Sequence, residues 1–140
     1  MTGGTSMLDH IFITVTDIAR AVAFYEQALA PLGIVHAVDY DGKDGPPGHP
    51  DLKGFGAGGR VFFWLRQGAA DPRSVHISFV AKSEAAVNAF HAAARLAGAA
   101  DNGEPGPRLH YDPRYYAANV LDPEGHSLEA VYKNWQLLQA

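Results

Sequence analysis

The sequence predicts an α+β domain built from two βαβββ modules, and two observations lead to this fold class. The segment HIFITVTDIARAVAF, from His10, resembles HISFVAKSEAAVNAF, from His76, so a strand and helix pattern occurs twice at an offset of 66 residues. The same offset relates the glycines of two turns, Gly59 and Gly125. A chain of 140 residues suits one domain. We therefore expect a single domain over 1–140, with modules over about 7–68 and about 74–135.

The first module begins with a strand and a helix. Residues 8–16 alternate between more and less apolar side chains, as in a strand. Asp17 is a good N-cap residue, apolar side chains at helical spacing follow it, and Gly33 ends the helix. The remaining predicted elements are a strand at 33–40, a loop rich in glycine and proline at 41–51, and two strands within 52–67 that are joined by the turn Gly58-Gly59.

The second module repeats this order and ends in a hairpin over 117–133. Ser83 caps its helix and Gly98 follows the helix end. Asp122 to Gly125 is a turn sequence, so strands flank it. Glu129 lies in the middle of the last strand beside apolar neighbours, where a carboxylate loses hydration and needs a cation or hydrogen-bond donors.

Composition excludes several classes of function. The chain has 11 basic and 15 acidic residues and a formal charge of -4, so it offers no basic field for nucleic acid or acidic lipid. It has no cysteine, no apolar run of the ~20 residues that a membrane span needs, and no signal-peptide core at its start. We expect a small-molecule partner, no nucleic acid or membrane partner, and a cytoplasmic location.

One face of each sheet is predicted to line a pocket. Each module is too small to bury both faces of its sheet, so the modules should pack together. The strand residues suited to lie beneath the helices are Ile11, Ile13, Val15, Ile77 and Phe79. The opposite face carries a more polar set, consisting of His10, Phe12, Thr14, His76, Ser78 and Val80. The offset of 66 makes Phe63 the counterpart of Glu129, so the four equivalent inward positions are His10, Phe63, His76 and Glu129.

Two imidazoles and one carboxylate in a sheltered pocket form a site for one divalent metal ion per chain. We therefore predict that His10, His76 and Glu129 are metal ligands. Iron, manganese, zinc and nickel all accept this ligand set. The other histidines have no such support, and we interpret them as solvated or local hydrogen-bonding groups: His36, His49, His91, His110 and His126.

The sequence resembles the vicinal oxygen chelate superfamily, which contains glyoxalase I, extradiol dioxygenases, fosfomycin resistance enzymes and bleomycin resistance proteins. Three segments carry the resemblance: LDHIFITVTDIARAVAFYEQALAPLGI, SVHISFVA and NVLDPEGHSLEAV. The resemblance implies paired half-barrel sheets around a metal-binding pocket, with His10, His76 and Glu129 at the ligand positions, and a homodimer. Phe63 departs from glyoxalase I, which has a fourth ligand there, and is more similar to the three-ligand dioxygenases and fosfomycin-modifying enzymes.

The segment PRLHYDPRYY, at 107–116, is a candidate for substrate recognition. It contains residues that orient an oxyanion or a ring, and an aromatic entry to the next strand with solvated arginines is an equal interpretation. We select Arg108 and Tyr115 from it. The candidate substrate-binding residues are Phe63, Arg108, Tyr115, Phe12 and Ser78, and the candidate catalytic residues are Glu129 and Tyr115.

Two functions of different class compete. The first is a metal-dependent enzyme, a lyase or a dioxygenase, whose ion chelates a small oxygen-bearing substrate and stabilises an oxyanion or enolate-like intermediate. The second is a drug-binding or metabolite-binding protein of the bleomycin-resistance kind, which needs a pocket and no metal. A third interpretation makes the three predicted ligands vestigial.

Overall fold

The structure, a computed structural model, describes residues 7–133 and 135. Its elements form two βαβββ modules, as the sequence predicts. Module 1 contains β1 (Ile11–Val15), α1 (Ile18–Leu29), β2 (Val35–Tyr40), β3 (Leu52–Ala57) and β4 (Arg60–Gln67). Module 2 contains β5 (His76–Val80), α2 (Glu84–Leu96), β6 (Ala100–Pro107), β7 (Tyr116–Leu121) and β8 (Ser127–Tyr132). Short 3-10 helices occupy Ala30–Leu32, Gly42–Asp44 and Pro72–Ser74.

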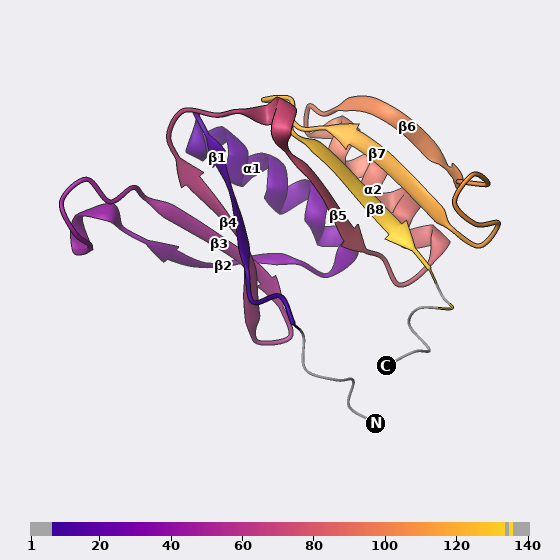
Figure 1. Cartoon of the computed structure of the whole chain (residues 1–140), viewed down its shortest axis with the longest axis horizontal. Coiled ribbons are helices and arrows are strands. Elements are labelled where there is room, and N and C mark those ends of the chain that lie inside the picture. Colours follow the sequence, from indigo (N-terminus) through magenta and orange to yellow (C-terminus); the bar gives the residue numbers. More distant parts are fainter. Residues whose placement is uncertain (1–6, 134, 136–140) are drawn as a thin grey trace.

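Each module forms one four-stranded sheet, and Figure 1 shows the helix of each module on one face of its sheet. Sheet A has the order β1-β4-β3-β2 and sheet B the order β5-β8-β7-β6, and in each sheet the first strand is parallel to the fourth strand of its module. Within the described residues no helix is both long and apolar enough to cross a bilayer.

Local sequence signals fix the helix ends where they were predicted. The carboxylate of Asp17 accepts a hydrogen bond from the amide of Arg20, and the hydroxyl of Ser83 accepts one from the amide of Ala86. Gly33 and Gly98 follow the two helical segments with φ of 77° and 112°, a region that favours glycine.

One hydrophobic core joins the two modules on the helix-covered sides of both sheets. Ile13, Val15 and Phe79 are buried in it, and Ile11 and Ile77 pack against it while partly exposed, so the predicted apolar faces are confirmed. The rings of Phe63 and Phe79 meet edge to face at 5.4 Å between centroids, which joins sheet A to sheet B within this core.

The two faces that are not covered by helices, called here the open face of sheet A and the open face of sheet B, do not close on each other. Figure 1 shows the two sheets spreading away from each other, with α1 and α2 packed together on their other sides. The fold class is therefore confirmed, and one chain supplies two open half-barrels.

Candidate metal and substrate site

The open face of sheet B brings two predicted metal ligands together. β5 and β8 are parallel neighbours, and the Nε2 atom of His76 lies 3.1 Å from Oε1 of Glu129. The side chain of His76 is half exposed, whereas Glu129 is only 6% exposed. Among the described residues, no lysine or arginine forms an ion pair with this buried carboxylate.

Two hydroxyl groups hold this pair in place. The Ser127 hydroxyl lies 2.8 Å from Nδ1 of His76, which directs the other ring nitrogen towards Glu129. The Tyr115 hydroxyl donates to Oε2 of Glu129 at 2.6 Å. Burial first, and the hydrogen bond to Glu129 second, raise the pKa of Tyr115 well above its ordinary value, so this phenol remains a donor.

The geometry of the pair fits a divalent cation. Adjacent ligands at bonds of about 2.0–2.2 Å from one ion lie roughly 3 Å apart, which is the separation of His76 Nε2 and Glu129 Oε1. A cation there would also compensate the desolvation of Glu129. Both ligands have an outer hydrogen-bond partner, an arrangement common in metal sites.

The third predicted ligand, His10, lies elsewhere in the single chain. Its side chain is 54% exposed, and its Nδ1 atom lies 2.6 Å from a carboxylate oxygen of Asp9. It lines a cavity of about 420 Å³ on the open face of sheet A with Phe12, Tyr40 and Trp64. One chain therefore assembles two of the three predicted ligands, and His10 faces a different space.

A different histidine belongs to a three-residue group that could hold a metal. Ligating atoms of His91, Asp101 and Glu104 lie within 4.8 Å of one another, and this is the one such group among the residues that the structure describes. His91 projects from α2, is nearly buried, and contacts Asp101 on β6 at 2.8 Å, so it is neither solvated nor locally bonded as expected. Register shifts in β6 bring the two carboxylates together, and the glycines and prolines at 103–107 are the sequence signal that could have indicated these shifts.

Phe63 does not lie on the open face of sheet A, so its predicted place as the counterpart of Glu129 is wrong. The strand registers pair Phe12 with Trp64 in sheet A and Ser78 with Glu129 in sheet B, so Trp64 is the counterpart of Glu129. Phe63 lies on the helix-covered side, 0% exposed, with its ring 5.1 Å from that of Tyr25.

A β-bulge explains the error. Phe55 and Gly56 are adjacent on β3 but pair with Phe63 and Val61 on β4, so Phe62 is an extra residue. The offset between modules changes at this bulge from 66 to 65, and a shift of one residue moves every later side chain to the other face.

The other candidate substrate residues lie on the open faces. Phe12 is half exposed in sheet A, and Ser78 pairs with Glu129 in sheet B. The guanidinium of Arg108 donates to Asn119, the neighbour of Glu129 on β7, and to backbone oxygens in the irregular strand β6. Arg108 therefore supports this part of the sheet with donors that are already engaged.

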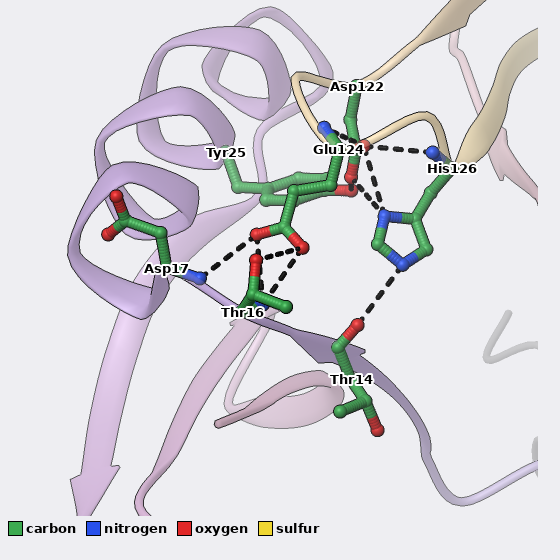
Figure 2. Close-up of polar contacts among 7 residues, drawn as sticks. All are labelled: Thr14, Thr16, Asp17, Tyr25, Asp122, Glu124 and His126. Atoms are coloured by element: carbon green, nitrogen blue, oxygen red, sulfur yellow. Dashed lines mark hydrogen bonds and ion pairs between the residues drawn. The ribbon is translucent and has the colours of Figure 1, made fainter. Parts of the chain in front are cut away.

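Sequence reasoning missed a polar cluster that joins the two modules, called here the hinge cluster (Figure 2). Asp122 accepts hydrogen bonds from the Tyr25 hydroxyl on α1 and from the His126 ring. The other ring nitrogen of His126 lies 3.1 Å from the carbonyl oxygen of Thr14, 112 residues away. The carboxylate of Glu124 accepts hydrogen bonds from the backbone amides of Thr16 and Asp17 at the start of α1, and from the Thr16 hydroxyl.

His126 was expected to be a local turn residue, but it is 0% exposed and reaches across the module boundary. Both ring nitrogens face acceptors, so a protonated ring donates to Asp122 and to Thr14 at once, and this arrangement favours the cation. Burial alone would lower the pKa of His126, but its contacts with Asp122 raise it. Burial alone would likewise raise the pKa of Asp122, but hydrogen bonds from His126 and Tyr25 lower it.

Comparison with known families agrees with the fold. Residues 7–130 match the model of the family described as Glyoxalase/Bleomycin resistance protein/Dioxygenase superfamily. No curated protein sequence matches the chain.

Several solved structures are similar. A glyoxalase/bleomycin resistance protein from Albidiferax ferrireducens T118 has 25% identity and a TM-score of 0.76, with 91% of this chain and 99% of that chain covered. The fosfomycin resistance protein FosX from Listeria monocytogenes has 18% identity and a TM-score of 0.64 over 97% and 98% of the chains. A glyoxalase I mutant from Zea mays has 20% identity and a TM-score of 0.69, covering 93% of this chain and 48% of that one.

Proposed function

Because the chain belongs to the glyoxalase/bleomycin resistance protein/dioxygenase superfamily, we propose that it is a divalent-metal-dependent enzyme, a lyase or dioxygenase that chelates a small oxygen-bearing substrate. The proposed ligands are His10, His76 and Glu129. The observation that carries the proposal is the 3.1 Å contact between His76 and the buried carboxylate of Glu129. Iron, manganese, zinc and nickel all suit these ligands.

The proposed site is shared by two copies of the chain. His10 lies on the open face of sheet A, whereas His76 and Glu129 lie on the open face of sheet B, and the two sheets spread apart within one chain (Figure 1). The open face of sheet A exposes the apolar side chains of Phe12, Val38 and Tyr40. Burial of this surface against another chain is favourable. A two-fold homodimer that joins sheet A of one copy to sheet B of the other gives two equal sites.

Each residue has a proposed role in this site. The bound ion supplies Lewis-acid stabilisation of substrate oxygens. Ser127 orients His76, and Tyr115 holds the second oxygen of Glu129. Glu129 is also the candidate proton acceptor, and the protonated Tyr115 hydroxyl is the candidate donor towards an oxyanion. Phe12 and Ser78 lie beside the ligands and are proposed to contact substrate.

A second candidate is a non-catalytic small-molecule binding protein of the bleomycin-resistance kind. The apolar open face of sheet A favours it, because a ligand could pack there without a metal. The two candidates differ in whether ligand binding needs a metal ion. The cytoplasmic location stays a prediction.

Metal binding by matched variants tests the proposal. Elemental analysis of the purified protein identifies the ion, and equilibrium dialysis of metal-free protein gives the stoichiometry and affinity. We expect about one ion per chain, and at least about a tenfold weaker affinity in His76→Ala and in Glu129→Ala. The exposed His110 is the matched control, and His110→Ala should keep the parent affinity. Unchanged affinity in both ligand variants would overturn the proposal.

A further inference from the structure

Trp64 occupies the place in sheet A that Glu129 occupies in sheet B. The two residues pair with Phe12 and Ser78 in equivalent registers, which sets them at the same depth of their sheets. Module 1 therefore offers an indole ring where module 2 offers a carboxylate. This ring lines the cavity of about 420 Å³ that also contains His10 and Phe12.

The strand beside Trp64 is shaped to let the ring lie against it. A Cβ atom on Gly54 would lie 2.9 Å from Cζ3 of Trp64 and 2.7 Å from Cγ1 of Val61, distances that real Cβ atoms do not show. Gly54 pairs directly with Trp64 in the antiparallel ladder of β3 and β4. The glycine thus leaves the space that the indole fills.

Trp64 and Phe12 together form one side of this cavity, called here the aromatic wall. A cation lies beside the ring of Phe12. The guanidinium carbon of Arg66 lies 4.2 Å from the ring centroid, and Nε and Nη2 of Arg66 both donate to the hydroxyl of Thr14. These hydrogen bonds hold the Arg66 guanidinium, which projects from β4, against Thr14 near the end of β1. The same cavity is lined by His10, the predicted metal ligand, and by the carboxylate of Asp9 that contacts it, whereas Trp64 and Phe12 are its aromatic part.

We infer that Trp64 is a specificity-determining residue that selects substrates whose metal-binding oxygens are attached to a flat apolar group. This inference rests on the proposed metal site. With an indole at the fourth position, sheet A supplies one ligand and an aromatic surface beside it. A ring attached to the chelating oxygens would stack on Trp64, whereas a small aliphatic chelator would leave that surface in water.

Two hydroxamates test this inference, because they share the same pair of oxygen donors. Benzohydroxamate carries a phenyl ring and acetohydroxamate carries a methyl group. In protein loaded with Co²⁺, calorimetry should show benzohydroxamate binding about tenfold more tightly than acetohydroxamate. Trp64→Ala should reduce this ratio to about twofold or less and leave the acetohydroxamate affinity nearly unchanged, and Trp64→Phe should keep most of the ratio.

Fluorescence reports the contact directly. The chain has two tryptophans, so Trp135→Phe leaves Trp64 as the single indole. Benzohydroxamate should change its emission, and acetohydroxamate should change it less. Failure of benzohydroxamate to bind the parent, or a ratio that survives Trp64→Ala in a folded variant, would overturn the inference.

A different result would contradict the proposed function. In that result both hydroxamates bind the metal-free protein and Glu129→Ala as tightly as they bind the parent loaded with Co²⁺. In that case the ratio of the benzohydroxamate and acetohydroxamate affinities in Trp64→Ala still tests whether the aromatic wall selects the phenyl ring. Trp64→Glu is a second variant that places a carboxylate at the fourth position. It should tighten Co²⁺ binding, alter the cobalt absorption spectrum and weaken both hydroxamates, because fewer coordination positions stay open. An unchanged spectrum in the folded variant would contradict the assigned position of Trp64.

Discussion

The open faces of the two sheets have the same strand order and different chemistry. Sheet B carries His76 and the buried Glu129, with Ser127 and Tyr115 behind them. At the position equivalent to Glu129, sheet A carries Trp64. One module thus presents polar ligands and the other an aromatic surface. A repeated fold can therefore divide a site into a part that binds an ion and a part that contacts the rest of the ligand.

Phe63 and Trp64, which are adjacent on β4, give the strongest test of which side chains face the core and which face the cavity. Phe63 is fully buried in the core, and Trp64 faces the cavity, so Phe63→Ala should lower the free energy of unfolding by about 3–5 kcal/mol. Trp64→Ala should cost about 1 kcal/mol, because its side chain is only partly buried. Urea denaturation of both variants measures the difference. Equal losses, or a larger loss for Trp64→Ala, would contradict the register.

The two modules also differ in the turn that joins their last two strands. The turn between β3 and β4 is Gly58-Gly59, whereas the turn between β7 and β8 contains Asp122 and His126 of the hinge cluster. Breaking this buried pair with His126→Gln should cost about 3 kcal/mol or more at about pH 5.5.

The pair also gives a pH dependence of known sign. The pKa of His126 is raised in the folded protein. Its contribution to the free energy of unfolding is therefore complete below the unfolded pKa of about 6.5 and is lost as the pH rises through the folded pKa. Because the pKa of Asp122 is lowered, its contribution is present above about pH 4 and is lost in acid. The difference in unfolding free energy between the parent and His126→Gln should therefore shrink from about pH 5.5 to about pH 8.5. A difference that grows over this range would contradict a charged His126.

Sequence reasoning succeeded where the signal is local. The caps at Asp17 and Ser83, the glycines after the helices and the DPEG turn each act within a few residues, so the elements follow from them. The repeat also predicted that His76 and Glu129 lie close together, which their paired strands confirm, and their role as metal ligands stays a prediction.

It failed where a position depends on other parts of the chain. The bulge at Phe62 was missed although Gly56 lies opposite it on β3, where a Cβ atom would lie 1.8 Å from the carbonyl oxygen of Arg60, so the assignment of Phe63 and Trp64 to faces was reversed. Asp122 is only four residues from His126, but the contact of His126 with Thr14 spans 112 residues, and no spacing pattern in the sequence predicts it. The separation of His10 from His76 depends on how the modules pack, which the repeat does not specify.

Subunit complementation tests the central claim, that the metal site joins His10 of one copy to His76 and Glu129 of another. His10→Ala and His76→Ala chains are unfolded together, refolded and loaded with metal, with native mass spectrometry to count mixed dimers. Each variant alone should bind little metal. In a mixed dimer one site lacks both histidines and the other is intact, so random mixing should restore about a quarter of the parent stoichiometry. If mixed dimers form and bind no more metal than the separate variants, the site does not lie between two chains.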